Sequence, residues 1–400
     1  MFSQITAITG INIKSIPERW GASLVIVVGL AGVVAVFTAL LAMAEGFSST
    51  LVAAGRSDLA LVLRGGSSNS ELNSAMSREV ATLITQAPGI RKGADGKPET
   101  ATELVIISEL PKKDEPQAAA GKRQTGVNVT LRGVEESSFA MRPKLKIIEG
   151  RKFQPGLREI VVGRGVIQQF QGAEVGKVVR MRGSDWTVVG VFESGDACES
   201  ELWVDAGTAQ TSFGRSGFSS ILAVLDGPDA LDKLKAALAA DPRLASDVTT
   251  QQEYFSAQTK QFRATIGVLA GFVVVIMGLG AIFAALNTMY AAVATRAREI
   301  ATLRAIGFGS LPVLVSIMIE AVFLALVGGF IGAMIAYVLF NNVSLSTLGA
   351  NFTQVVFSFK VTPQLVGTGL IIALVIGFCG GLLPAARAAR IPITTALRES

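Results

Sequence analysis

The sequence has 400 residues, of which 50% are hydrophobic and 17% are charged, with a net charge of +5 and a pI near 9.3. This balance is typical of a membrane protein with a sizeable water-exposed part rather than of a soluble enzyme. The chain contains no histidine, which excludes Ser-His-Asp and Cys-His hydrolases, His-ligated zinc and histidine proton relays. Its basic residues form no stripe interleaved with aromatic residues, so we expect no nucleic-acid partner.

The segment 1–21 precedes the first long apolar run and places isoleucines among polar residues. This pattern predicts a cytoplasmic amphipathic helix that lies in the membrane interface, is broken near Pro17 and is anchored by Trp20. An irregular tail is the alternative interpretation.

Four apolar runs are each long enough for the roughly 20 residues that a membrane-spanning helix needs. They predict transmembrane helices at 22–44, 261–293, 309–340 and 361–384, the second of them with a cytosolic extension. The first run ends in an A-x-A pattern at Ala42 to Ala44, as a signal peptide does, but its apolar core is too long for one. We therefore expect the first helix to remain uncleaved. The four spans are expected to form a helical bundle in contact with membrane lipids.

Basic residues cluster before the first span, between the second and third, and after the fourth. The positive-inside rule then places both termini, the tail 385–400 and the segment 294–308 in the cytoplasm. The large segment 45–260 and the short loop 341–360 fall on the opposite side, in the periplasm of a bacterial inner membrane.

The segment 45–260 has an ordinary soluble composition and short β-branched runs. Strands are predicted at 59–64, 103–109, 126–134, 158–163, 177–193 and 219–226, with a hairpin turn at 183–185. Helical patterns interleave at about 71–86, 165–171 and 228–240. The segment therefore predicts an α+β domain inserted between the first and second spans.

Glycines spaced four apart recur in the last three spans, and small residues at this spacing let helix backbones approach closely. The positions are Gly267, Gly271, Gly328, Gly332, Gly377 and Gly381. Packing within the bundle and a seam between two copies of the chain are equally open interpretations.

Glu320 is a carboxylate inside a predicted span. A charged side chain at the centre of a bilayer costs about 3 kcal/mol, so an interior-facing, functional position is expected. Glu320 lies two to three helical turns after Gly309, however, so a place at the level of the lipid headgroups is equally open.

The segment "ATRAREIATLRAIGFG", residues 294–309, is a charged island between two apolar runs. The run 264–295 extends about 48 Å as a helix, against about 30 Å of hydrocarbon, so its end projects into the cytosol. The following residues favour a continuation of the helix, with Gly307 as the residue that ends it. Such a helix, fused rigidly to a span, can transmit force.

The residues after Arg296, "RAREIATLRAIGFGSLPVLVSIMIEAVFLALVGGFIGAMIAY", strongly resemble the FtsX-like permease domain of ABC transporters. The ending "LLPAARAARIPITTALRES" is also similar to that family. Upstream, "EGRKF…REIVVGRGV…GKVVRM…WTVVGVFES" is similar to the periplasmic core domain of MacB-type permeases. No ATPase motif lies in these residues.

This resemblance implies a permease subunit of a type VII, mechanotransmission ABC transporter whose ATPase is a separate cytoplasmic subunit. The ATPase binds ATP and Mg, and this chain is neither an enzyme nor a holder of a cofactor or metal. The resemblance further implies a second permease copy, in a homodimer or heterodimer, and in some relatives a periplasmic adaptor and an outer-membrane channel. The implied ATPase-coupling residues are Arg296, Arg298, Glu299, Ile300, Leu303, Arg304 and Gly307. Arg387, Pro392 and Leu397 would add a C-terminal cytoplasmic contact.

Two other functions stay open. The same mechanical stroke drives a periplasmic cell-wall hydrolase in non-transporting relatives, which the resemblance associates with a smaller outer domain. A membrane-anchored enzyme lacks a recognisable nucleophile, base or metal cluster in the sequence.

Overall fold

The computed structural model describes residues 2–15, 17–67, 70–113, 126–348 and 354–390. The chain divides into two compact units, which we call the helical unit and the sheet unit. The helical unit comprises Met1–Gly46, Phe262–Val343 and Phe359–Ser400. The sheet unit comprises Phe47–Gln261 together with Ser344–Ser358, a segment that the sequence placed in a short loop.

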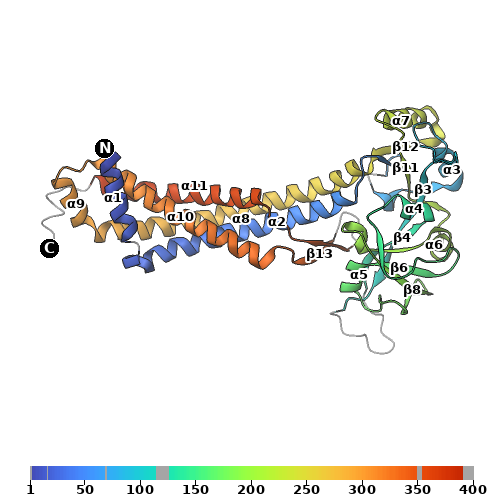
Figure 1. The fold of residues 1–400 in the computed structure, drawn as a ribbon, viewed down its shortest axis with the longest axis horizontal. Helices are drawn as coiled ribbons and strands as arrows, with labels where there is room; N and C mark the ends of the chain where they lie inside the picture. Colours follow the sequence, from blue (N-terminus) through green and yellow to red (C-terminus); the bar gives the residue numbers. More distant parts are fainter. Residues whose placement is uncertain (1, 16, 68–69, 114–125, 349–353, 391–400) are drawn as a thin grey trace. The chain divides into compact units, whose positions relative to one another are not determined.

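Among the described residues, the helical unit contains four long apolar helices and three shorter helical elements, and α2 and α8 also extend into the sheet unit. Its elements are α1 (Phe2–Lys14), η1 (Pro17–Arg19), α2 (Trp20–Ala54), α8 (Gln251–Thr295), α9 (Ala297–Ala305), α10 (Ser310–Phe340) and α11 (Pro363–Ala389). In the described part of the chain, α2, α8, α10 and α11 are long and apolar enough to cross a membrane. The predicted bundle of four spans is confirmed in this sense, and the break expected near Pro17 separates α1 from α2. Figure 1 shows α10 and α11 side by side, with α1 and α9 at the same end of the bundle.

Glycines on α10 and α11 allow the close approach of neighbouring helices. A Cβ atom on Gly332 would lie 2.3 Å from the carbonyl oxygen of Ala31, and one on Gly328 would lie 2.7 Å from that of Val27. On α11, an added Cβ atom on Gly377 would lie 2.3 Å from an alanine side chain of α10, and one on Gly381 would lie 2.6 Å from another. These four positions pack inside the bundle, as small residues do between helices in lipid.

The pair on α8 behaves differently. A Cβ atom on Gly267 or Gly271 would meet no atom within 4 Å, so neither glycine is needed for packing within the described residues. Large apolar side chains on the same helix, Val268 and Phe272, are 74% and 64% exposed. Packing inside one chain therefore does not explain this pair.

We predict that Gly332→Ala lowers the free energy of unfolding of the bundle by about 1–3 kcal/mol, the usual cost of overpacking. The matched control, Gly367→Ala on α11, adds the same methyl group where no atom lies within 4 Å and should leave stability unchanged or slightly raised. Thermal unfolding of the purified protein in detergent measures both. Equal effects of the two substitutions would contradict the packing described for α10.

The sheet unit is organised around a ten-stranded sheet in the order β12-β1-β11-β3-β4-β9-β6-β8-β5, with β7 also paired to β8. Its strands are β1 (Leu59–Arg64), β3 (Thr100–Leu110), β4 (Val127–Val134), β5 (Lys146–Gly150), β6 (Glu159–Gly163), β7 (Val178–Met181), β8 (Ser184–Glu193), β9 (Glu201–Asp205), β11 (Ser220–Val224) and β12 (Ser246–Thr250). Most neighbours are antiparallel, and β4–β9 and β6–β8 are parallel. Two-stranded pairs join β2 (Met76–Ser77) to β10 (Gly217–Phe218) and β13 (Ser344–Leu348) to β14 (Gln354–Ser358).

Helices lie between these strands along the chain, which confirms the predicted α+β class. They are η2 (Glu71–Asn73), α3 (Arg78–Thr85), α4 (Glu136–Ala140), α5 (Arg164–Gln169), η3 (Ala197–Ser200), α6 (Ala206–Phe213), α7 (Ala230–Ala240) and η4 (Pro242–Leu244). Each predicted strand run contains a strand, and the run 177–193 forms β7 and β8. Their turn is centred on Arg182 and Gly183, both with positive φ (45° and 79°), slightly earlier than predicted.

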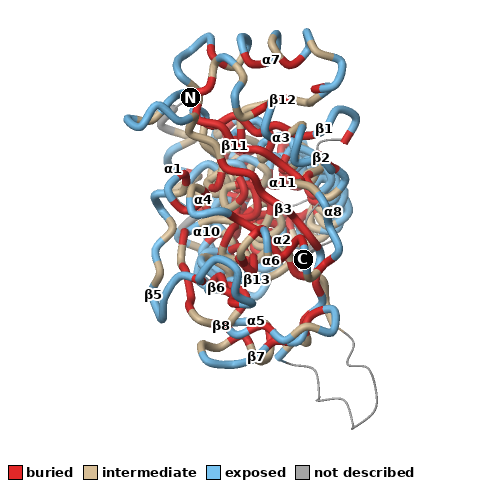
Figure 2. Tube along the Cα trace, turned by 90° about the vertical axis from the view of Figure 1, so that its right-hand side faces the viewer, coloured by how far each residue is buried: buried red, intermediate tan, exposed pale blue. Residues whose placement is uncertain are grey.

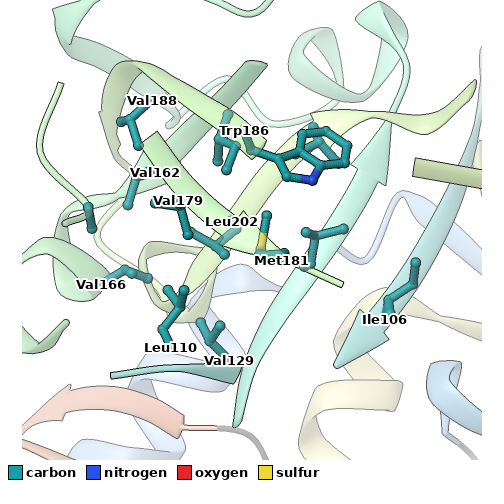
Figure 3. Packing of buried hydrophobic residues seen from close by; sticks show 14 of the residues in the cluster. Ile106, Leu110, Val129, Val162, Val166, Val179, Met181, Trp186, Val188 and Leu202 are labelled. Atoms are coloured by element: carbon teal, nitrogen blue, oxygen red, sulfur yellow. The ribbon is translucent and has the colours of Figure 1, made fainter. Parts of the chain in front are cut away.

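The core of the sheet unit is formed mainly by apolar side chains. The central strands β3 and β11 are largely red in Figure 2, and every residue of β11 is buried. In Figure 3 the Trp186 indole, which is 0% exposed, lies near Met181 and Leu202 among aliphatic side chains of several strands. Burial of this surface is the main force that holds the unit together.

A cluster of charged side chains is also buried in the sheet unit, and it centres on Arg132 of β4. The Arg132 guanidinium donates to Glu71 and Glu103 at 2.9 Å each and to Glu201 at 2.8 Å. Arg142 donates to the two carboxylate oxygens of Glu103 at 2.6 and 2.9 Å. The cluster joins η2, β3, β4 and β9, and removal of one partner from such a group costs about 3–5 kcal/mol.

We predict an acid transition for the sheet unit from Glu103. Burial alone would raise the pKa of Glu103, but Arg142 and Arg132 lower it from 4.5 to about 2. Because the folded-state pKa is the lower one, the stabilisation is present above about pH 4.5 and is lost as the pH falls towards 2. Fluorescence of the buried Trp186 and Trp203 during acid unfolding measures this loss.

The variant Glu103→Gln should flatten this pH dependence between pH 4.5 and 2 and should be less stable than the parent at pH 7. The control Glu136→Gln changes a carboxylate whose side chain is 83% exposed and should keep the parent profile. An unchanged profile in Glu103→Gln would show that the acid sensitivity comes from other groups.

Candidate functional site

The charged island folds as a separate short helix. α8 stops at Thr295, Arg296 leaves helical geometry (φ −102°, ψ 7°), and α9 begins at Ala297. The expectation of an unbroken helix through this segment is therefore wrong. Arg296 lies at this break, and its side chain contacts Ser15 and Glu320 on other elements.

The end of α9 follows the prediction for Gly307, which has φ +104°. The N–H of Gly307 donates to the carbonyl of Arg304 at 3.2 Å, and the N–H of Phe308 donates to that of Leu303 at 3.1 Å. This pair of hydrogen bonds is a Schellman motif, which needs a left-handed residue at the position of Gly307. α9 is thus bounded by defined geometry at both ends.

Glu320 of α10 lies between two arginines, and its side chain is 6% exposed. Its carboxylate oxygens are 3.5 Å from the Arg19 guanidinium and 3.7 Å from the Arg296 guanidinium. The Ser15 hydroxyl accepts a hydrogen bond of 2.8 Å from each arginine. We call Ser15, Arg19, Arg296 and Glu320 the joint cluster, because it connects the end of α1, η1, the α8–α9 break and α10.

α1 is part of the same arrangement. The Asn12 amide donates to the Ser316 hydroxyl at 2.7 Å in a buried hydrogen bond between α1 and α10. Ile8 is 3% exposed and belongs to the apolar core that also holds Ile300 of α9. α1 therefore packs against the helices of the bundle through one face. A cavity of about 40 Å³ beside the joint cluster is lined mainly by apolar side chains of α1, α8, α9 and α10.

The predicted coupling residues divide into an inner and an outer set. Ile300 is 8% exposed and Arg296 points into the joint cluster, so neither is available to a partner protein. Arg298 and Glu299 are exposed, and Leu303 and Arg304 are half-buried. Glu299 and Leu303 also line the cavity beside the joint cluster, and the Glu299 carboxylate is 3.3 Å from the Arg296 guanidinium. The outer set therefore combines an accessible surface with contacts to the anchor.

Ile306 was missed by the sequence analysis, although its side chain is 69% exposed. Leu303 lies four residues after Glu299, and Ile306 lies three residues after Leu303, so the three share one side of the helix. This spacing was the signal that would have found it. The outer surface of α9 is therefore mixed, with an apolar stripe beside Arg298.

The predicted C-terminal contacts are described only in part. The Arg387 guanidinium lies over the Tyr290 ring at 5.5 Å from its centroid, which fixes the end of α11 against α8. Pro392 and Leu397 lie outside the described residues. Within those residues, no group of three His, Cys, Asp or Glu side chains is arranged to hold a metal ion.

Two family profiles cover most of the chain. The MacB-like periplasmic core domain matches residues 22–241, and the FtsX-like permease C-terminal domain matches residues 271–393. The chain belongs to the MacB-like and FtsX-like family of ABC-transporter permeases. The first profile covers most of α2 and most of the sheet unit, and the second covers part of α8 together with α9, α10 and α11.

Curated relatives of this permease cover two thirds or more of it. It is 29% identical over 306 residues to the macrolide export ATP-binding/permease protein MacB of Hahella chejuensis, across 69% of this chain and 44% of that protein. It is 26% identical over 292 residues to the ABC transporter permease YknZ of Bacillus subtilis, across 68% of this chain and 70% of that protein. The permease thus spans less than half the length of the first relative.

Solved structures that resemble this permease are domains from outside the membrane. The extracellular domain of YknZ from Gram-positive bacteria matches 48% of this chain with a TM-score of 0.35 and 17% identity, over 100% of that domain. The periplasmic region of MacB from Actinobacillus actinomycetemcomitans matches 54% of this chain with a TM-score of 0.35 and 15% identity, over 94% of that region.

We predict that Arg296→Ala loosens α9, whereas Arg298→Ala does not. The first substitution removes a charged hydrogen bond, worth about 1.5–3 kcal/mol, and leaves Glu320 with one arginine. Tryptic cleavage after Arg304 should then accelerate roughly tenfold or more. Arg298 is exposed and two residues away, so its variant should be cleaved at the parent rate. Equal cleavage of both variants would contradict the anchoring role of Arg296.

Proposed function

We propose that this chain is the permease subunit of an ABC transporter in a bacterial inner membrane, with ATP and Mg bound by a separate cytoplasmic ATPase subunit. The ATPase moves the cytoplasmic end of the bundle, and the long helices carry this motion to the sheet unit in the periplasm. The moving sheet unit then drives export or extraction of a substrate from the periplasm or the outer leaflet.

The arrangement of α9 carries this proposal. A helix that receives force from a partner needs an exposed surface for the partner and a stiff attachment to the spans. Arg298, Leu303 and Ile306 contribute to the first, and the joint cluster with Ile300 supplies the second. A helix that only fixed membrane topology would need its charges but not this buried anchor.

The sidedness follows from the distribution of charge. Arginines and lysines concentrate near α1, α9 and the end of α11, which the positive-inside rule assigns to the cytoplasm. The sheet unit inserts between the first and second spans and therefore lies on the other side. Its match to the periplasmic core domain of the family supports this placement.

A second permease copy completes the transporter in this proposal, as a homodimer or as a heterodimer with a related chain. The open glycines Gly267 and Gly271 on α8 support a close helix contact outside the chain, because nothing in the described residues packs on them. The relatives include proteins named for macrolide export. We propose export as the process, and an adaptor protein and an outer-membrane channel as further partners.

We predict that Leu303→Asp abolishes stimulation of the partner ATPase by the permease while membrane insertion stays intact. A carboxylate on the apolar stripe of α9 would be desolvated in the contact, at a cost of several kcal/mol. Arg304→Glu should also reduce stimulation of the partner ATPase. The control is Val178→Asp, which places a carboxylate at a 58% exposed position of β7 in the sheet unit. ATPase activity of the reconstituted complex, with and without permease, is the measurement, and full stimulation by Leu303→Asp would refute this surface.

A further inference from the structure

The chain between α10 and α11 forms a β-hairpin that belongs to the sheet unit. β13 and β14 pair in antiparallel register from Ser344 with Ser358 to Leu348 with Gln354. The flanking residues Val343 and Phe359 belong to the helical unit. The hairpin is thus held by the sheet unit while its two ends continue directly into two spans.

The hairpin is docked on η3 and α5 of the sheet unit by a hydrogen bond and by side-chain packing. The backbone N–H of Val356 donates to the Ser200 hydroxyl at 2.8 Å. The Val356 side chain lies over Gly165, where an added Cβ atom would approach it to 3.0 Å. A side chain at position 165 would therefore force Val356 to shift.

An aromatic contact holds the same strand on the α2 side. The Phe357 side chain is 2% exposed, and its ring meets that of Phe47 edge to face, with 5.6 Å between centroids. Gln354, at the start of β14, is 8% exposed. A hairpin that only linked two spans would have no reason to bury these side chains.

The two ends of the hairpin are stiffened by hydrogen bonds where they leave the spans. The N–H of Asn342 donates to the carbonyl of Phe359, and the N–H of Phe359 donates to that of Val343, both at 3.0 Å. The N–H of Val361 donates to the side-chain oxygen of Asn341 at 3.2 Å. These hydrogen bonds join the residues that follow α10 to the residues that precede α11.

We propose that the β13–β14 hairpin is a mechanical tie that makes the ends of α10 and α11 move together with the sheet unit. The tie adds to the connections through α2 and α8, each of which contributes residues to both units. The docking itself needs no partner and no ATP, whereas its use in coupling rests on the proposed function. Ser200, Gly165 and Phe47 are the positioning residues that hold it.

Amide hydrogen exchange of the full-length protein in lipid nanodiscs tests the docking. In the parent, peptides that cover Gln354–Ser358 should exchange slowly, and Ser200→Ala should accelerate them about tenfold, the factor that one hydrogen bond supplies. The control Ser344→Ala removes an exposed hydroxyl contact inside the hairpin, 3.1 Å from Ser358, and should leave β14 protected. Fast exchange of β14 in the parent would overturn the docking.

The mechanical role is tested by ATPase stimulation in the reconstituted complex. Phe357→Ala removes the buried ring and should reduce stimulation severalfold while the protein stays folded and inserted. The control Leu345→Ala shortens the 45% exposed cross-strand neighbour of Phe357 and should stimulate like the parent. Full stimulation by Phe357→Ala, in a complex that Leu303→Asp inactivates, overturns the tie. If Leu303→Asp is also fully active, the proposed coupling surface fails instead.

Discussion

The helical unit depends on one buried carboxylate. Glu320 costs free energy in an apolar bundle unless cations neutralise it, and Arg19 and Arg296 come from two different parts of the chain to do so. Arg296 lies between the end of α8 at Thr295 and the start of α9 at Ala297, so this contact is made at the break itself. The exposed stripe of α9 is consequently presented by an element whose position the bundle determines. Electrostatic compensation in an apolar environment therefore supplies the stiffness that a force-transmitting helix needs.

The sequence predicted most of the elements whose signals are local. The apolar runs, the break near Pro17, the stop at Gly307 and the β-branched strands depend on residues close in the chain, and the structure contains all of them. β9 and β12, "ELWVD" and "SDVTT", were missed because their polar residues hide the strand pattern. Glu201 of β9 is buried only because Arg132, far away in sequence, neutralises it.

The candidate site was predicted as a set of residues but not as an arrangement. On sequence alone, Arg296, Ile300 and Leu303 shared the same predicted coupling role. Only the fold shows that Arg296 and Ile300 anchor α9, whereas Leu303 is part of its accessible surface. Arg19 was treated as a topology signal, whereas it is a partner of Glu320. The docked hairpin between α10 and α11 was also missed, since its strand pattern is short and its partners lie in residues 47–200. Pairings across such distances cannot be read from periodicity.

The account requires that α9 and the sheet unit face opposite sides of one membrane. Single cysteines at Thr302 in α9 and at Arg180 in β7, in a background with Cys198→Ala and Cys379→Ala, report this directly, since both positions are exposed. A membrane-impermeant maleimide applied to intact cells should label position 180 at once and position 302 only after the membrane is opened. Labelling of both positions in intact cells, or of position 302 alone, would contradict the proposed transmission of force across the membrane.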